Sequence, residues 1–204
     1  MKIQKPKITY IEKGRLDEDE LFQKEFEGNG KKNIEVKSTT VDSCIFHDVD
    51  FSNIKMEDVD VLDCIFEKCD LSNQVFDDHI VRRVQFKECK LVGTSFINAA
   101  LKDVSFTDCM ARYINLANAS LQNVEIRNSD FSKMSLLNTE MKSVEISGGT
   151  IAESEIYQTS MDGMDLSTTS IEGLSVDLDS VKGITIDSLQ ATDLLGLLRI
   201  KVKR

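Results

Sequence analysis

An apolar residue recurs at every fifth position from Val36 to Ala191, which makes 32 consecutive positions without an exception. Hydrophobic residues make up 41% of the chain, so chance does not account for this run. Neither an α-helix nor a β-strand places every fifth side chain on one face, because their side-chain periods are 3.6 and 2. A chain that turns a corner every five residues does so. The sequence therefore predicts a four-sided coil of about twenty residues, repeated as a solenoid.

Inward residues twenty positions apart would stack in neighbouring coils at about 4.8 Å, the ordinary spacing of paired strands. One such column is predicted to form the core ladder, and its members are Phe46, Phe66, Phe86, Phe106, Ile126, Ile146, Leu166 and Ile186. Stacked rings followed by aliphatic side chains would fill a narrow interior without a cavity. A polar column is predicted to form an amide ladder from Asn98, Asn118, Asn138 and Gln158. The single proline, Pro6, agrees with a backbone whose N–H groups are needed for pairing.

The residue types that carry chemistry are few. The five cysteines all lie two residues before an inward position, and they are Cys44, Cys64, Cys69, Cys89 and Cys109. We predict reduced thiols packed as small hydrophobes, with a disulfide or metal site between stacked cysteines as the alternative. His47 and His79 have no metal-spaced or nucleophilic partner in the sequence, so we expect hydrogen-bonded or solvated imidazoles. We accordingly predict no catalytic residue, no metal, no cofactor and no enzymatic activity.

The two ends of the chain depart from the repeat. Residues 1–35 are predicted to form an N-terminal cap, with a strand over residues 7–11 and irregular or helical structure from there to Phe26. The solenoid, of about eight coils, is expected over residues 36–187. Residues 188–204 are predicted to form a short helix and a tail with a strand at residues 200–202. The leucines here either cover the last coil or form a homodimer contact; we favour the dimer, with the interface residues Leu189, Leu194, Leu195 and Leu198.

The formal net charge of −10 is unevenly distributed. Residues 36–191 contain 26 acidic and 13 basic residues, whereas the last 13 residues have one acid and four bases. Acidic residues concentrate in residues 42–78 and 143–191, and the stretch between them is slightly basic. We predict an acidic surface formed by Glu125, Glu145, Glu153, Glu155, Asp162, Asp165, Glu172 and Asp177. The simplest explanation of these carboxylates is a solvated surface that keeps the rod from aggregating.

Composition also limits the classes of partner. A sequence pI near 4.8 argues against direct binding to nucleic acid or to an anionic membrane, because both need a cationic footprint. No window approaches eighteen uncharged apolar residues, and the charged N-terminus does not resemble a signal peptide. We therefore expect a cytoplasmic protein.

The repeat, as in Ser43-Cys44-Ile45-Phe46-His47 or Ala117-Asn118-Ala119-Ser120-Leu121-Gln122, resembles the pentapeptide-repeat family. This resemblance implies a right-handed quadrilateral β-helix. Residues 186–191 and 194–200 look like the terminal segment of the quinolone-resistance (Qnr and MfpA) branch, in which such a helix joins two rods end to end. That similarity implies binding to DNA gyrase or topoisomerase IV in place of DNA. Two functions stay open: an acidic rod that mimics DNA, and a general protein-interaction scaffold whose charge serves solubility.

Overall fold

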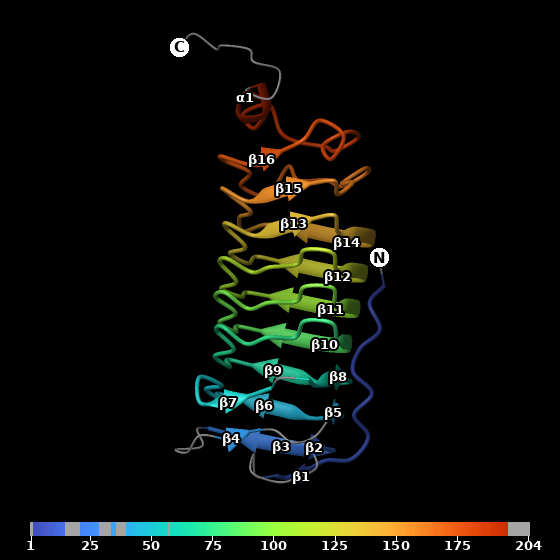
Figure 1. The fold of residues 1–204 in the computed structure, drawn as a ribbon, viewed down its shortest axis with the longest axis vertical. Helices are drawn as coiled ribbons and strands as arrows, with labels where there is room; N and C mark the ends of the chain where they lie inside the picture. The colour runs from blue at the N-terminus through green and yellow to red at the C-terminus, as the bar shows by residue number, and fades with distance from the viewer. Residues whose placement is uncertain (1, 15–20, 29–33, 36–39, 57, 196–204) are drawn as a thin grey trace.

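The computed structural model describes residues 2–14, 21–28, 34–35, 40–56 and 58–195. They form an all-β parallel solenoid, a tall stack in which the strands lie across the long axis (Figure 1). Strands in neighbouring coils pair residues twenty positions apart, as Phe46 pairs with Phe66 and Phe86 with Phe106. The predicted twenty-residue coil is therefore confirmed.

The longest ladder has eight strands: β1 (Glu12–Lys13) at its N-terminal end and seven that follow it. These seven are β3 (Lys24–Glu27), β6 (Ile45–His47), β9 (Ile65–Glu67), β10 (Ile80–Lys87), β11 (Ala100–Thr107), β12 (Ser120–Arg127) and β14 (Glu140–Ser147). A second ladder begins at β2 (Leu21–Phe22), continues through β5 (Thr40–Asp42) and β8 (Asp60–Leu62), and joins the first ladder at β10. Shorter ladders elsewhere on the coil join β4 (Ile34–Glu35) to β7 (Ile54–Lys55), and β13 (Ser135–Leu137) to β15 (Glu155–Tyr157) and β16 (Ser175–Val176). The total of about eight coils stays a prediction.

Corners occur at intervals of five residues, where the backbone turns into the left-handed region. Asn118 (φ 57°), Asn123 (φ 54°) and Asn128 (φ 50°) occupy three successive corners of one coil. Asn, Asp and Gly tolerate this conformation best, which explains the polar short side chains of the repeat. The predicted amide column also lies at a corner, and Asn138 Nδ2 donates to Asn118 Oδ1 across 3.0 Å.

The core is a continuous stack of side chains inside the coils. Phenylalanine rings in successive coils lie nearly parallel, with centroids 4.7 Å apart for Phe46 and Phe66 and 5.0 Å apart for Phe86 and Phe106. Seven members of the predicted core ladder are at most 5% exposed. The eighth, Ile186, is only partly buried, because it lies in the last turns before the C-terminal end of the solenoid.

The solenoid begins before the predicted boundary at residue 36. β2 and β3 lie in the segment predicted to be irregular or helical, and Phe26 stacks on Phe46 with centroids 4.8 Å apart. The sequence holds a signal for this earlier start, since Leu21 and Phe26 share the five-residue period of Val36. Lys31 interrupts that period and hid the first coil.

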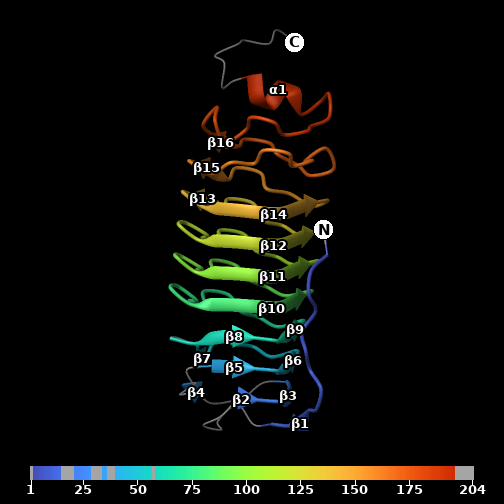
Figure 2. The same cartoon turned by 90° about the vertical axis from the view of Figure 1, so that its right-hand side faces the viewer.

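The strand predicted over residues 7–11 is wrong. Residues 2–11, which we call the strap, run along the side of the stack, and the N-terminal end of the strap lies near the level of β12 and β14 (Figures 1 and 2). The backbone N–H groups of Gln4 and Lys7 donate to the carboxylates of Asp103 and Asp63, at 3.2 Å and 2.7 Å. Side chains of the solenoid thus take the donors that a strand would have used. Strand β1 (Glu12–Lys13) follows and pairs with β3.

At the other end, the chain leaves the last coil in a single helical turn, α1 (Ala191–Leu194). Leu198 and the strand predicted at residues 200–202 lie outside the described residues. Among the residues that the structure describes, no helix is long and apolar enough to cross a membrane.

Candidate functional site

The two histidines lie in polar surface clusters. His47 Nε2 lies 3.4 Å from a carboxylate oxygen of Glu25, and Nδ1 lies 3.1 Å from one of Glu67. His79 lies two residues before an inward position, as the cysteines do, but its side chain is 23% exposed and lies 3.3 Å from Asp60. In the described ranges, no three His, Cys, Asp or Glu side chains are arranged to hold a metal ion.

The cysteines line the interior as small side chains. All five are buried and free. Each thiol reaches a backbone carbonyl of the preceding coil, as Cys89 Sγ does with Phe66 O at 3.4 Å and Cys109 Sγ with Phe86 O at 3.5 Å. Burial raises the pKa of the Cys109 thiol to about 11. A buried thiol with a raised pKa is a poor nucleophile, so Cys109 acts as a small packing group.

The predicted acidic surface surrounds the C-terminal coils. Six of its eight residues are exposed, and they are Glu145, Glu153, Glu155, Asp162, Asp165 and Glu172. The corners at Gly148, Glu153, Gln158 and Gly163 divide this part of the chain into sides of the coil. Exposed carboxylates occur on every side, since Glu145, Glu155, Asp162 and Glu172 come from four different five-residue segments. The charge therefore encircles the rod.

The stack expected for Glu125, Glu145 and Asp165 is present in its first step only. Glu125 and Glu145 pair in register between β12 and β14, whereas the ladder ends at β14 and no backbone bridge joins the described residues Glu145 and Asp165. An open pocket of about 370 Å³ lies at this level, lined in part by Met141, Glu145 and Asp162. The coil after β14 thus departs from the regular ladder.

Two of these carboxylates are held in the charged form by nearby donors. The hydroxyl and backbone N–H of Ser167 lower the pKa of Asp165. The backbone N–H groups of Gln158 and Ser180 lower the pKa of Asp177. Because hydrogen bonds to a carboxylate favour its ionised form, these residues keep their charge in mildly acidic solution.

The basic middle of the chain is partly neutralised. Five of its cations pair with carboxylates, and these pairs are Arg83–Asp63, Lys90–Asp70, Arg112–Asp130, Arg127–Glu125 and Lys133–Glu153. The four exposed pairs contribute little to stability, whereas Arg83–Asp63 is largely buried. All five pairs reduce the positive charge that separates the two acidic zones.

Sequence analysis missed the column beneath the strap. Asp63 and Asp103 are 6% and 2% exposed, and Arg83 lies between them in the column and pairs with Asp63. Two coils span about 9.6 Å, and the three residues from Gln4 to Lys7 span about 10 Å when extended. The spacing of the Gln4 and Lys7 N–H groups along the strap therefore equals the spacing of the Asp103 and Asp63 carboxylates, which lie two coils apart. This match depends on tertiary structure, because backbone N–H groups carry no side-chain signal.

The predicted dimer residues differ in exposure. Leu189 is 81% exposed, whereas Leu194 and Leu195 are partly buried and Leu194 packs against the core. Elsewhere on the surface, Met110 and Tyr113 are 49% and 53% exposed on one coil. Leu189 is thus the predicted interface residue that is fully available for contact.

Comparisons with known proteins identify the repeat. The family model for the pentapeptide repeat region matches residues 59–131 and 79–156. Solved structures with a similar fold include a trypsin-treated form of QnrB1, a plasmid-mediated fluoroquinolone resistance protein, at 17% identity over 89% of each chain with a TM-score of 0.49. HetL of the cyanobacterium Nostoc is 14% identical over 82% of this chain and 89% of its own, with a TM-score of 0.38. A pentapeptide repeat protein of the Arabidopsis thaliana thylakoid lumen is 19% identical over 63% and 86%, with a TM-score of 0.31. No curated protein sequence matches the chain.

Proposed function

We propose that this chain, which belongs to the pentapeptide-repeat family, is a non-enzymatic binding protein whose acidic C-terminal coils occupy a cationic, DNA-binding surface of a partner. The observation that carries the proposal is the set of exposed carboxylates on all sides of these coils. Duplex DNA also presents its charges around the whole circumference of a rod. A type II topoisomerase, DNA gyrase or topoisomerase IV, is the candidate partner, because such an enzyme binds the duplex through a cationic surface.

The linear charge density supports this comparison. Residues 143–191 contain nine acids and one base, Lys182. These residues make about two and a half coils, or about 12 Å of rod at about 4.8 Å per coil. The net charge of −8 then corresponds to one charge per about 1.5 Å, against about 1.7 Å in duplex DNA. A homodimer through Leu189 would place two such stretches on either side of one centre.

A supercoiling assay tests the proposal. The purified chain should inhibit gyrase or relieve its inhibition by a quinolone, and the effect should fall steeply with salt because it replaces a polyanion. The double variant Glu155→Lys and Glu172→Lys should lose most of the effect. The variant Glu88→Lys, which changes an exposed acid in the middle of the rod, is the matched control and should retain it. Neither inhibition nor relief by the wild-type chain, or equal loss in the control, would contradict the proposal.

A second function, a scaffold for another protein, is favoured by the exposed pair Met110 and Tyr113. Lys133 Nζ lies 5.4 Å from the centre of the Tyr113 ring, so this patch combines an apolar and a cationic surface. Docking through the apolar side chains of Met110 and Tyr113 would depend on salt much less than docking through the carboxylates. Loss of partner capture in Met110→Asp, with no loss in Glu155→Lys, would support the scaffold over the DNA mimic.

A further inference from the structure

Four unpaired cations of the middle of the rod lie on the strands that the strap crosses or borders. Arg82, Lys87, Lys102 and Lys142 are exposed and form no ion pair with another described residue. They lie on β10, β11 and β14, where Arg82 pairs in register with Lys102. Arg82, Lys87 and Lys102 therefore lie on two neighbouring coils, and Lys142 lies two coils beyond Lys102. None of the four charges is cancelled by a carboxylate partner.

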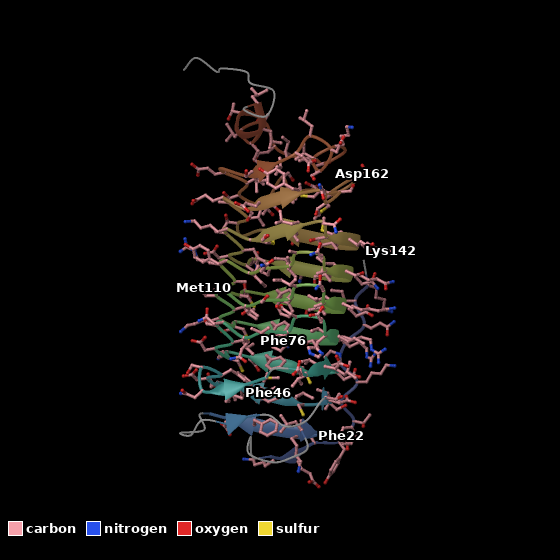
Figure 3. All side chains as sticks on the ribbon, viewed as in Figure 1. Phe22, Phe46, Phe76, Met110, Lys142 and Asp162 are labelled. Atoms are coloured by element: carbon pink, nitrogen blue, oxygen red, sulfur yellow. The ribbon has the colours of Figure 1, made fainter. Side chains whose placement is uncertain are left out.

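The strap adds three more cations to the same part of the surface. Lys2, Lys5 and Lys7 are all exposed, and the strap passes beside β10, β11 and β12 (Figures 1 and 2). Lys142 projects outward on the side of the rod along which the strap runs (Figure 3). Hydrogen bonds from Gln4 and Lys7 to buried carboxylates hold the strap in this position. Residues far apart in the sequence thus form one cationic surface on an acidic protein.

A pocket of about 290 Å³ opens between the strap and the solenoid. Lys2 and Lys5 line it from the strap, and Gln85, Ser105 and Arg127 line it from three consecutive coils. Glu125 is also on the wall, where its carboxylate pairs with Arg127.

Two donors in this pocket are available to a ligand. The side-chain amide of Gln85 and the hydroxyl of Ser105 form no hydrogen bond with another residue in the described part of the chain. Both lie in the same column of neighbouring coils, and Ser105 is only 8% exposed. No buried side-chain nitrogen or oxygen of the described residues lacks a partner, so the Ser105 hydroxyl, which has none, is open to the pocket and to a bound anion or solvent.

We propose that this pocket binds a small phosphate-bearing anion, with Lys2, Lys5 and Arg127 as its cationic ligands and Gln85 and Ser105 as its neutral donors. Ammonium and guanidinium groups form strong charge-assisted hydrogen bonds with phosphate oxygens, and a phosphate has enough acceptors for all five groups. The pocket has room for a compact anion and not for a folded partner. Arg82 and Lys102 lie outside the pocket and increase the rate at which the anion arrives.

Calorimetric titration of the 204-residue chain with inorganic pyrophosphate tests this site. We expect saturable binding of one anion per chain that weakens between about 50 mM and 150 mM salt. The double variant Lys2→Glu and Lys5→Glu should bind at least about tenfold more weakly. Because these changes could also displace the strap, Arg127→Gln provides a second variant in strand β12, and it should also weaken the binding of pyrophosphate.

Two matched controls change surface lysines on other sides of the coil, Lys90→Glu and Lys133→Glu, and should leave binding within about twofold of the wild type. Absence of saturable binding, or equal loss in these controls, would overturn the proposal. A short single-stranded oligonucleotide is titrated in parallel. Tighter binding of the oligonucleotide that depends on Arg82 and Lys102 but not on Lys2 and Lys5 would also overturn it, in favour of a nucleic-acid surface.

Discussion

Replacement of Phe66 by alanine should cause one of the largest losses of stability in this chain. The ring is fully buried, with its centroid 4.7 Å from that of Phe46 and 5.1 Å from that of Phe86. Removing a buried phenylalanine side chain costs about 3–5 kcal/mol of unfolding free energy. We expect the upper half of this range, because two stacked contacts of about 0.5–1.5 kcal/mol each are lost. The ladder of main-chain hydrogen bonds also fixes the coil spacing, so neighbouring coils cannot close the cavity.

Urea denaturation followed by circular dichroism measures this loss, with Phe22→Ala as the control. Phe22 is 51% exposed, so its truncation should cost no more than about 0.5 kcal/mol. Hydrogen exchange should accelerate most in β6, β9 and β10, because each coil of a solenoid contacts only its neighbours. A loss below about 1.5 kcal/mol in Phe66→Ala, or a loss equal to that of Phe22→Ala, would refute the stacked-core argument.

Three further predictions concern the ends and the interior. Leu189→Asp should halve the mass measured by light scattering if the rods dimerise there, whereas Leu178→Asp should not; a monomeric wild type would exclude the dimer. Cys109 should react with a thiol reagent only after unfolding, because burial raises its pKa to about 11, and rapid reaction of the native chain would contradict this. Burial opposes ionisation of Asp63, but hydrogen bonds from Arg83 and the Lys7 N–H lower its pKa below 3.8. The ionised carboxylate therefore stabilises the folded chain above pH 3.8, and this stabilisation is lost as the pH falls through the lowered pKa. Asp63→Asn should cost about 1–3 kcal/mol at pH 7 and less in acid, measured by urea denaturation at both pH values; an equal cost at both would contradict the assignment.

The repeat allowed most of the fold to be predicted because it is local. Each five-residue unit specifies an inward side chain such as Phe86 and a corner residue such as Asn118, and its neighbours then follow from stacking. The same regularity predicted the buried position of the cysteines. It failed where the period was interrupted at Lys31, so the first coil, with Phe26 in its core, was assigned to the cap.

The candidate sites were less accessible to sequence reasoning. Counting charges located the acidic C-terminal stretch, but only the corners of the coil showed that Glu145, Glu155 and Glu172 lie on different sides. Likewise, a count of cations showed only that the middle of the chain is weakly basic. The structure separated the paired cations, such as Arg112, from unpaired ones such as Lys102.

The sequence by itself determined the coil, its twenty-residue period and the composition of its core, because these depend on residues at fixed, short separations. Tertiary structure alone decided the position of the strap. Its contacts are hydrogen bonds from backbone N–H groups, which every residue type except proline can donate, to Asp63 and Asp103. No side-chain pattern in residues 2–11 specifies such partners, and the acceptors become neighbours only after the coils have stacked. The proposed anion pocket depends on that same placement.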